Sequence, residues 1–202
     1  MDLLGERVRL RAFRDDDAEA ITRLVALPEV AGTLELWARS PYRLAEAHDF
    51  LARRSPDSPQ WAVECGADGA FLGVTGLEPI DWRNRHAEWG IWLGPASRWG
   101  QGYGGEACRL AVSYAFWELG LEKVWLHVLP DNERARRAYT RSGFTEEGRL
   151  RRHVFRQGRF DDLIVMAVHR DHPIYQGAPL YLPDPAPGDP EPAASSGRTQ
   201  RR

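Results

Sequence analysis

The chain of 202 residues is 43% hydrophobic and 28% charged, a balance that suits one globular domain with a sizeable core. Its formal net charge of −2 gives no electrostatic reason to expect a nucleic-acid or membrane partner. Cys65 and Cys108 are too few for a disulfide framework, and neither they nor the six histidines show metal-ligand spacing. The N-terminus lacks a signal-type apolar core and no long apolar run occurs, so we expect a cytoplasmic protein without a metal site.

The first half of the chain reads as one strand, two helices and three further strands. Apolar and charged residues alternate over 6–13, which predicts a strand. The aspartate triplet at 15–17 favours the start of a helix over 18–27, and Pro28 is expected to end it. A second helix is predicted over 42–54. Three consecutive strands are then predicted over 60–65, 71–80 and 86–93.

The second half alternates helices and strands. Apolar residues recur with helical spacing over 106–119, and Gly120 supplies a stop signal. A strong strand is predicted over 123–129, followed by a short helix that ends at Arg141. The whole order predicts an α+β fold, mostly antiparallel in its first half, with one βαβ-like step into the strand at 123–129.

Two extended runs, over 149–155 and 160–168, flank Gln157-Gly158 and predict a β-hairpin. From His172 onward the chain holds seven of its fourteen prolines and an Ala-Ala-Ser-Ser-Gly run. We therefore expect one domain over 1–171 and a proline-rich, disordered tail over 172–202.

The most informative motif lies between Trp99 and Ala107, where the chain reads Trp-Gly-Gln-Gly-Tyr-Gly-Gly-Glu-Ala. Glycines allow backbone N–H groups to approach an anion closely. A helix that begins near Gly104 or Gly105 adds unpaired N–H donors and the positive end of its dipole. We therefore interpret this glycine loop as a phosphate cradle.

The same loop also fits the dinucleotide fingerprint G-x-G-x-x-G from Gly100 to Gly105. A Rossmann site needs a strand that runs directly into the first glycine, whereas residues 94–98 intervene here. Asp131, after the next strand, can mimic the ribose-binding acid, so a nicotinamide-dependent enzyme stays open. A P-loop is excluded more firmly because no Gly-Lys-Ser or Gly-Lys-Thr follows, and a turn that merely packs tightly is the simplest alternative.

Six stretches and one single residue stand at a characteristic joint spacing. They are 73–77 (Gly-Val-Thr-Gly-Leu), 84–91 (Asn-Arg-His-Ala-Glu-Trp-Gly-Ile), 99–107, 132–135 (Asn-Glu-Arg-Ala), 139–144 (Tyr-Thr-Arg-Ser-Gly-Phe), 147–151 (Glu-Gly-Arg-Leu-Arg) and Met166. Together they resemble the GNAT acetyltransferases, and more narrowly the RimJ/RimL-like branch, over most of residues 6–170. Trp99 stands where the broad family often has Gln or Arg, a departure that the RimJ/RimL-like branch shares.

The resemblance implies a mixed, mostly antiparallel central sheet flanked by helices, with acetyl-CoA in the cleft between two splayed strands, 86–93 and 123–129. Amides of the glycine loop would bind the pyrophosphate, and N–H groups at the end of the first splayed strand would polarise the thioester carbonyl. Asn132 would either cap the following helix or bind the pantetheine arm. The implied cosubstrate-binding residues are Trp92, Leu93, Gln101, Gly102, Tyr103, Gly104, Gly105, Glu106 and Asn132.

Acetyl transfer to an amine requires a neutral amine, a stabilised carbonyl oxygen and a neutralised thiolate. No acyl-enzyme signature occurs and Cys108 reads as packing filler, so we expect direct attack in a ternary complex. The resemblance makes Tyr139 the candidate acid. Free tyrosine titrates at about 10 and a thiol at about 8.5, which favours hydrogen bonding to the thiolate over full proton transfer. Glu88, mid-strand among apolar and aromatic residues, is the candidate base, with an ion pair to Arg85 or another arginine as the alternative.

The RimJ/RimL likeness favours a protein N-terminal amine as the acceptor. An amine-bearing small molecule (an amino acid, polyamine or antibiotic) stays open, as do a non-catalytic CoA-binding domain and a homodimer. The resemblance implies that the loop with Glu29, Glu35 and Trp37 shapes the acceptor site. Five arginines crowd the final hairpin, and we read them as a solvated face, with an acidic acceptor or a ribosomal contact as the alternative. They are Arg149, Arg151, Arg152, Arg156 and Arg159.

Overall fold

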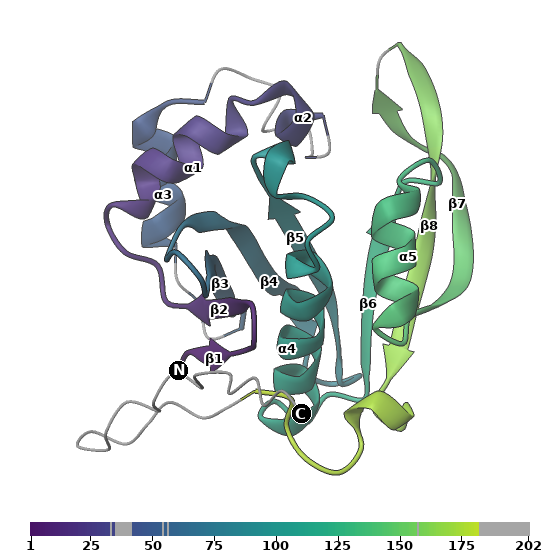
Figure 1. Cartoon of the computed structure of the whole chain (residues 1–202). Coiled ribbons are helices and arrows are strands. Elements are labelled where there is room, and N and C mark those ends of the chain that lie inside the picture. Colours follow the sequence, from purple (N-terminus) through teal and green to yellow (C-terminus); the bar gives the residue numbers. More distant parts are fainter. Residues whose placement is uncertain (33, 35–41, 54, 56, 157, 182–202) are drawn as a thin grey trace, which may run out of the picture.

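The computed structural model describes residues 1–32, 34, 42–53, 55, 57–156 and 158–181. Within this part of the chain, the strands form one eight-stranded sheet in the order β1-β2-β3-β4-β5-β6-β8-β7 (Figure 1). The strands are β1 (Leu3–Leu4), β2 (Val8–Arg11), β3 (Gln60–Cys65), β4 (Phe71–Asp81), β5 (His86–Leu93), β6 (Lys123–Val128), β7 (Thr145–Arg156) and β8 (Arg159–His169). The α-helices are α1 (Asp17–Val25), α2 (Pro28–Ala31), α3 (Leu44–Ala52), α4 (Tyr103–Trp117) and α5 (Glu133–Arg141).

The predicted α+β fold is confirmed, because every pair of neighbouring strands is antiparallel except β5–β6, which is parallel. The expected βαβ-like step is the connection from β5 through α4 to β6. One helix boundary was predicted wrongly: Pro28 does not end α1, which stops at Val25, but begins α2. Proline suits a first helical position, since its missing N–H would have no partner there.

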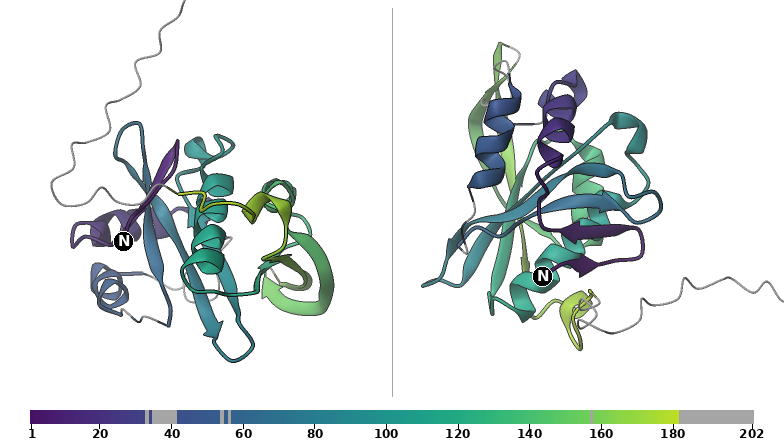
Figure 2. Two further views of the ribbon diagram at one scale, coloured as in Figure 1. Left: turned by 90° about the horizontal axis from the view of Figure 1, so that it is seen from below. Right: turned by 90° about the vertical axis from the view of Figure 1, so that its left-hand side faces the viewer.

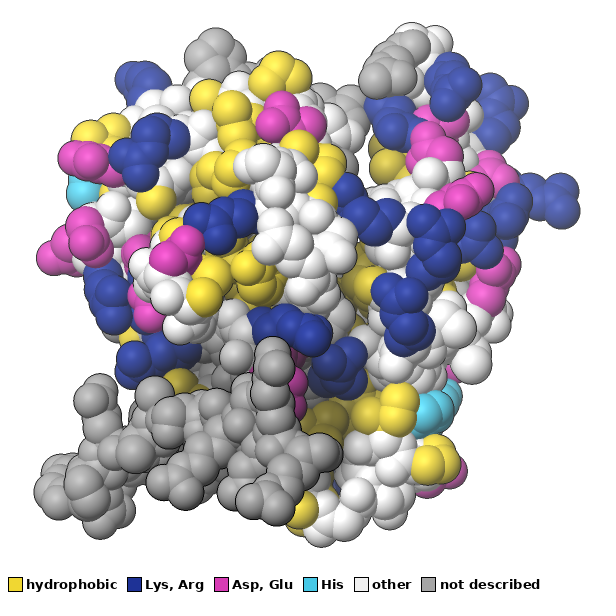
Figure 3. Space-filling model, in the orientation of Figure 1, with side chains coloured by type: hydrophobic (Ala, Val, Ile, Leu, Met, Phe, Trp, Pro, Cys, Tyr) yellow, Lys and Arg dark blue, Asp and Glu magenta, His cyan; other side chains and the backbone are white. Residues whose placement is uncertain are grey.

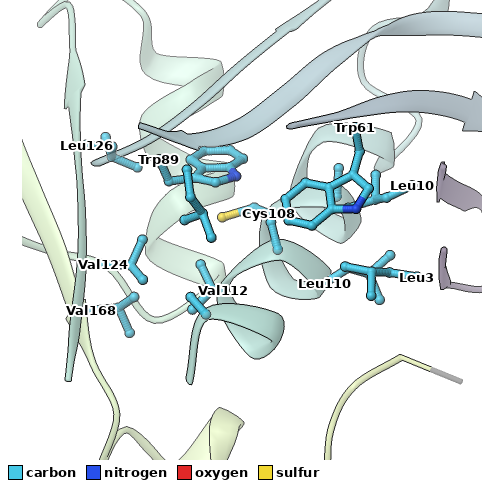
Figure 4. Packing of buried hydrophobic residues seen from close by; sticks show 14 of the residues in the cluster. Leu3, Leu10, Trp61, Trp89, Cys108, Leu110, Val112, Val124, Leu126 and Val168 are labelled. Carbon is cyan, nitrogen blue, oxygen red and sulfur yellow. The ribbon is translucent and has the colours of Figure 1, made fainter. Parts of the chain in front are cut away.

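Two hydrophobic clusters pack on opposite faces of the sheet. The larger lies between the sheet and α4, and the smaller lies under α1 and α3, which are on the other side of the strands from α4 (Figure 2). Leu72 belongs to the first and its neighbour Phe71 packs against the second, as strand alternation requires. Figure 4 shows Trp61 and Trp89 on the α4 side, with the Cys108 sulfur between them. In the described part of the chain, no helix is both long and apolar enough to cross a membrane.

The sheet is split between β5 and β6. β5 and β6 pair at three positions, and Glu88, opposite Trp125, is the last. Beyond that point β5 stays paired with β4 as far as Leu93, while β6 stays paired with β8 as far as Val128. The two ribbons diverge in Figure 1, as the predicted splay of these strands requires. The opening lies beside the start of α4 and places two unpaired strand edges opposite each other.

Packed structure continues beyond the boundary that we expected after residue 171. Tyr175 is 2% exposed, packs edge-on against Phe116 at 5.3 Å between ring centroids, and donates a hydrogen bond to Ser142 O at 2.7 Å. Leu180 N donates to Ser113 Oγ at 2.9 Å. These contacts move the end of the packed domain to residue 181, and residues 182–202 lie outside the described part of the chain. Proline content alone did not reveal the buried tyrosine.

Candidate active site

The glycine loop forms the start of α4. Gly102 is the N-cap residue, with a left-handed φ of +90° that favours glycine. The N–H of Glu106 is already satisfied inside the helix, because it donates to Gly102 O at 3.0 Å. The three preceding helical amides, of Tyr103, Gly104 and Gly105, have no carbonyl one turn earlier within the helix to accept them. These amides and the positive end of the helix dipole are the features that favour an anion, so the predicted phosphate cradle stays a prediction with this geometry behind it.

Glu106 has a structural role that the sequence did not reveal. Its buried carboxylate accepts hydrogen bonds from the backbone N–H groups of Glu6, Arg7 and Val8, at 2.9, 2.8 and 3.0 Å. The N–H of Glu106 donates to Gly102 O inside the helix, so it is not free to bind the cosubstrate, contrary to the prediction. The residue instead fixes the turn between β1 and β2 against the first turn of α4.

That turn brings Arg7 over the glycine loop. A Cβ placed on Gly102 would lie 2.9 Å from Arg7 Nη1, so the guanidinium rests directly on this glycine. Arg7 was not among the predicted site residues, because alternation on a strand does not say which loop its side chain will meet. An arginine above exposed helical amides adds positive charge to the predicted phosphate cradle.

Side chains around the loop hold it in place. Gln101 donates to Ser97 O at 3.2 Å and accepts a hydrogen bond from the Tyr103 hydroxyl at 3.1 Å. Arg98 pairs with Asp68 at 2.6 Å, and this hydrogen bond lowers the pKa of Asp68 to about 2. The side chains of Gln101 and Tyr103 therefore brace the loop.

Trp99 joins the loop to both sides of the split. Its Nε1 donates to Leu93 O at 2.8 Å, and the guanidinium of Arg134, in the first turn of α5, stacks on its ring at 3.8 Å from the centroid. Cation–π stacking of this kind needs an aromatic ring, so it gives a physical reason for tryptophan at this position.

The end of β5 offers one of its two predicted amide donors to the split. Gly94 N–H donates to Leu72 O on β4, and alternate residues of a strand direct their N–H groups to the same side. The amide of Trp92 therefore points to β4, while that of Leu93 points to the open edge. This corrects the prediction for Trp92, whose ring packs near Phe71 at 6.3 Å on the α1–α3 face.

Glu88 occupies the branch point of the split and pairs with a histidine. Its Oε1 lies 3.0 Å from Nδ1 of His127 on β6, and the two side chains are 29% and 27% exposed. The predicted alternative, an ion pair with an arginine, finds no support in Arg85, which bonds Gly120 O and Glu122 instead. His127 was missed, since we tested the histidines only for metal-ligand spacing.

Tyr139, on α5, packs against the face of β5 that is opposite to Glu88. Its ring packs edge-on against Trp89 at 5.5 Å, and Trp89 and Glu88 point to opposite faces because they are neighbours on β5. Burial raises the pKa of the Tyr139 hydroxyl, with nearby Cys108 adding to the rise and Arg134 opposing it. The phenol therefore stays protonated at neutral pH. Among the described residues, its hydroxyl has no hydrogen-bond partner, and its predicted role as the acid stays a prediction.

The other residues singled out in the sequence include a helix cap and a buried thiol. Asn132 caps α5, because its Oδ1 accepts from Ala135 N at 3.2 Å, and capping was one of its two predicted roles. Cys108 is fully buried and its thiol pKa is raised to about 12, in keeping with its reading as packing filler. Glu29 is exposed on α2, while Glu35 and Trp37 lie outside the described residues, so their predicted role at the acceptor site stays a prediction.

Comparisons with known proteins identify a family and named relatives. The family model described as an acetyltransferase (GNAT) domain matches residues 7–145. The spermidine N(1)-acetyltransferase of Escherichia coli (strain K12) is 30% identical over 164 residues, covering 80% of this chain and 85% of that protein. The putative ribosomal N-acetyltransferase YdaF of Bacillus subtilis (strain 168) is 31% identical over 169 residues, covering 80% of this chain and 90% of that protein.

Solved structures agree with the sheet topology. The crystal structure of spermidine N-acetyltransferase from Vibrio cholerae in complex with CoA and spermine superimposes with a TM-score of 0.73 at 27% identity. The match covers 83% of this chain and 98% of that one. A crystal structure described as a probable acetyltransferase gives a TM-score of 0.76 at 26% identity, covering 84% of this chain and 97% of that one.

Proposed function

The chain belongs to the GNAT acetyltransferase family and is an acetyl-CoA-dependent N-acetyltransferase, and from that premise we propose that it acetylates the N-terminal amine of an acidic peptide or protein. The observation that carries this choice of acceptor is the excess of arginine on the β7–β8 hairpin, beside the Glu88–His127 pair. We also propose which residues bind acetyl-CoA and which residues take part in the acetyl transfer.

The residues of the loop fit the phosphates of acetyl-CoA. The absence of a Cβ at Gly102 lets Arg7 rest on the loop, and the amides of Tyr103, Gly104 and Gly105 supply donors that an anion can satisfy. Bound acetyl-CoA supplies an acetyl group activated as a thioester. The Leu93 amide at the open edge of β5 is the proposed donor to its carbonyl oxygen. Asn132 keeps its side-chain N–H groups for the pantetheine arm while its Oδ1 caps α5.

The two faces of β5 suit the two proton requirements of the reaction. The amine nitrogen forms the new C–N bond, the C–S bond breaks, and the amine loses one proton to the Glu88–His127 side. Tyr139, on the opposite face, donates a hydrogen bond to the departing thiolate. No acyl-enzyme is needed, which agrees with the buried and protonated state of Cys108.

Replacing Tyr139 with phenylalanine is expected to lower kcat by about 10- to 100-fold, the kinetic equivalent of one hydrogen bond to a charged group. The affinity for acetyl-CoA should change little, because the ring and its packing against Trp89 are kept. Steady-state kinetics and calorimetric titration with CoA separate the two effects. A kcat equal to that of the unmodified protein would remove the assigned role.

The hairpin beside the catalytic groups is positively charged. Residues 149–162 contain five arginines against two aspartates. Asp161 forms ion pairs with Arg156 and Arg159, and Asp162 forms one with Arg149. Both carboxylates of the hairpin therefore already have arginine partners. Within the described residues, Arg151 and Arg152 form no ion pair. Figure 3 shows Lys and Arg side chains gathered over α5 and this hairpin.

This charge favours an acidic acceptor over a polycation. His153 on β7 stacks on His127 at 6.4 Å between ring centroids, which places the hairpin next to the Glu88–His127 pair. A polyamine presents several ammonium groups and needs unpaired carboxylates, whereas Arg151 and Arg152 can bind carboxylates of a peptide chain. The relatives named for spermidine therefore share the reaction, and we propose that this chain differs from them in its acceptor.

A panel of amines tests the proposal. We expect acetyl-CoA-dependent thiol release to be faster with a peptide whose free N-terminus precedes acidic residues than with its lysine-substituted counterpart or spermidine, with product mass confirming one added acetyl group. Arg151→Glu combined with Arg152→Glu should raise KM for the acidic peptide by about 10-fold or more, as expected for the loss of two charged contacts. Arg83→Glu, on the exposed turn between β4 and β5, is the matched control and should leave KM unchanged. Faster acetylation of spermidine than of every peptide would contradict the proposal.

A further inference from the structure

The Glu88–His127 pair contains two groups, and the structure indicates how they divide the work. Glu88 Oε1 and His127 Nδ1 are 3.0 Å apart at the mouth of the split. Glu88 is the last residue of β5 that pairs with β6, and His127 lies two positions beyond that pairing. Both are more than a quarter exposed, so an acceptor can reach either of them.

We propose that His127 accepts the proton of the attacking amine and that Glu88 is a positioning residue that orients the imidazole. The inference rests on the proposed transfer of an acetyl group to an amine at this site, and it holds for any class of amine acceptor. As the C–N bond forms, the proton leaves the amine nitrogen for Nε2 of His127.

Hydrogen bonding fixes the required tautomer. A carboxylate such as Glu88 can only accept, so Nδ1 of His127 must carry the proton that lies between them. Nε2 of the neutral ring is then the lone-pair nitrogen that can accept a proton. The same carboxylate stabilises the imidazolium that forms, which is the arrangement by which an acid orients a histidine base in hydrolases.

The chemistry of the two groups also favours histidine as the base. A free imidazole titrates at about 6.5, a free glutamate at about 4.3 and an α-amine at about 7.7 to 8.0. Proton transfer from the ammonium form of such an amine is therefore roughly 100-fold more favourable to an imidazole than to a carboxylate. A general base is most efficient when its pKa lies near the working pH.

The residues around His127 pack against its ring, and Glu88 is its acidic hydrogen-bond partner among them. The Trp125 ring meets it edge-on at 4.9 Å on β6, and Val165 lies opposite it on β8. The titratable groups that face it are Glu88 on β5 and His153 on β7, whose ring stacks at 6.4 Å. The carboxylate is thus the one acidic partner that the described neighbours provide.

A second carboxylate–imidazole pair on the same sheet supplies a matched control. His169 Nε2 lies 3.0 Å from Glu147 Oε1, and Glu147 also pairs with Lys123 at 2.5 Å. His169 pairs with Lys123 across β6 and β8, at the end of β6 where the sheet is closed. The two pairs share the oxygen–nitrogen distance, although the bonded ring nitrogen is Nδ1 in His127 and Nε2 in His169. Of the two, only the Glu88–His127 pair borders the split.

The test compares His127→Ala, His127→Asn, Glu88→Gln and His169→Ala, assayed with whichever amine the unmodified enzyme acetylates fastest. Asparagine at 127 can still donate a hydrogen bond to Glu88 but cannot accept the proton, so it separates positioning from base function. We expect both His127 variants to lose at least about 100-fold in kcat with unchanged CoA affinity. Glu88→Gln should lose about 10-fold, and His169→Ala should stay within twofold.

Two further readouts distinguish a base from a structural side chain. Added imidazole should restore part of the activity of His127→Ala and none of the activity lost in Glu88→Gln. The acidic limb of the kcat/KM profile should be present in the unmodified enzyme and disappear in His127→Asn. Near-normal activity of His127→Asn, or a Glu88→Gln variant far less active than His127→Ala, would overturn the inference. A polyamine as the fastest acceptor would contradict the acceptor proposed above and leave this test intact.

Discussion

Replacing Gly102 with valine is expected to reduce the affinity for CoA by at least about 100-fold. The residue has a φ of +90°, which a β-branched side chain adopts only with strain of about 1 to 3 kcal/mol. Its Cβ would also lie 2.9 Å from Arg7 Nη1 and would displace the guanidinium from the cradle. Calorimetric titration with CoA measures the effect directly.

Gly100→Val is the matched control for this substitution. Gly100 has a similar φ of +80°, but a Cβ there would meet nothing within 4 Å. The two variants thus share the backbone strain and differ in whether the new side chain enters the space beside Arg7. We expect the control to lose some stability and to bind CoA with close to normal affinity. Equal affinities of Gly102→Val and the unmodified protein would refute the phosphate cradle.

Glu106→Gln is expected to lower the free energy of unfolding by about 3 kcal/mol, a loss typical of breaking a buried charged network. The carboxylate accepts three backbone N–H groups, whereas an amide offers one oxygen and places its own N–H groups against the remaining donors. The affinity for CoA should also fall, because the bond to the Arg7 amide helps to place the arginine over the glycine loop.

Denaturant unfolding at neutral pH, with and without CoA, measures both consequences. Glu133→Gln is the control, since Glu133 also lies in the first turn of a helix but is exposed and pairs with Arg137. An exposed pair of this kind contributes about 0.5 kcal/mol or less. If the two variants lost the same stability, the three hydrogen bonds to Glu106 would not hold the β1–β2 turn as described.

Local patterns account for what the sequence predicted correctly. Short runs rich in apolar and aromatic residues, with turn residues beside them, place β3 and β5 at the predicted residues, 60–65 and 86–93. The glycines at 100–105 predict a helix start at this loop because their effect on the backbone is local. The first turn of α4 differs by one or two residues, since Gly102 rather than a later glycine supplies the cap.

The missed features depend on contacts between residues far apart in the chain. Glu106 meets the β1–β2 turn about a hundred positions away, and His127 meets Glu88 at a separation of 39. Neither pairing leaves a periodic signal in the sequence. Tyr175 was assigned to the tail because nearby prolines outweighed one aromatic residue, although that residue fills a space against Phe116. Such contacts follow from topology, which a single sequence specifies only through the whole fold.

The split between β5 and β6 also has a consequence for how the molecule holds together. Beyond Glu88 the two halves of the sheet share no ladder, so their cooperation depends on the packing of α4 and α5 across the gap. The pantetheine arm carries amide groups that can bond to both open edges, much as an added strand would. A ligand that bonds to both edges would therefore stabilise the folded sheet, by an amount that rises with its concentration relative to its Kd.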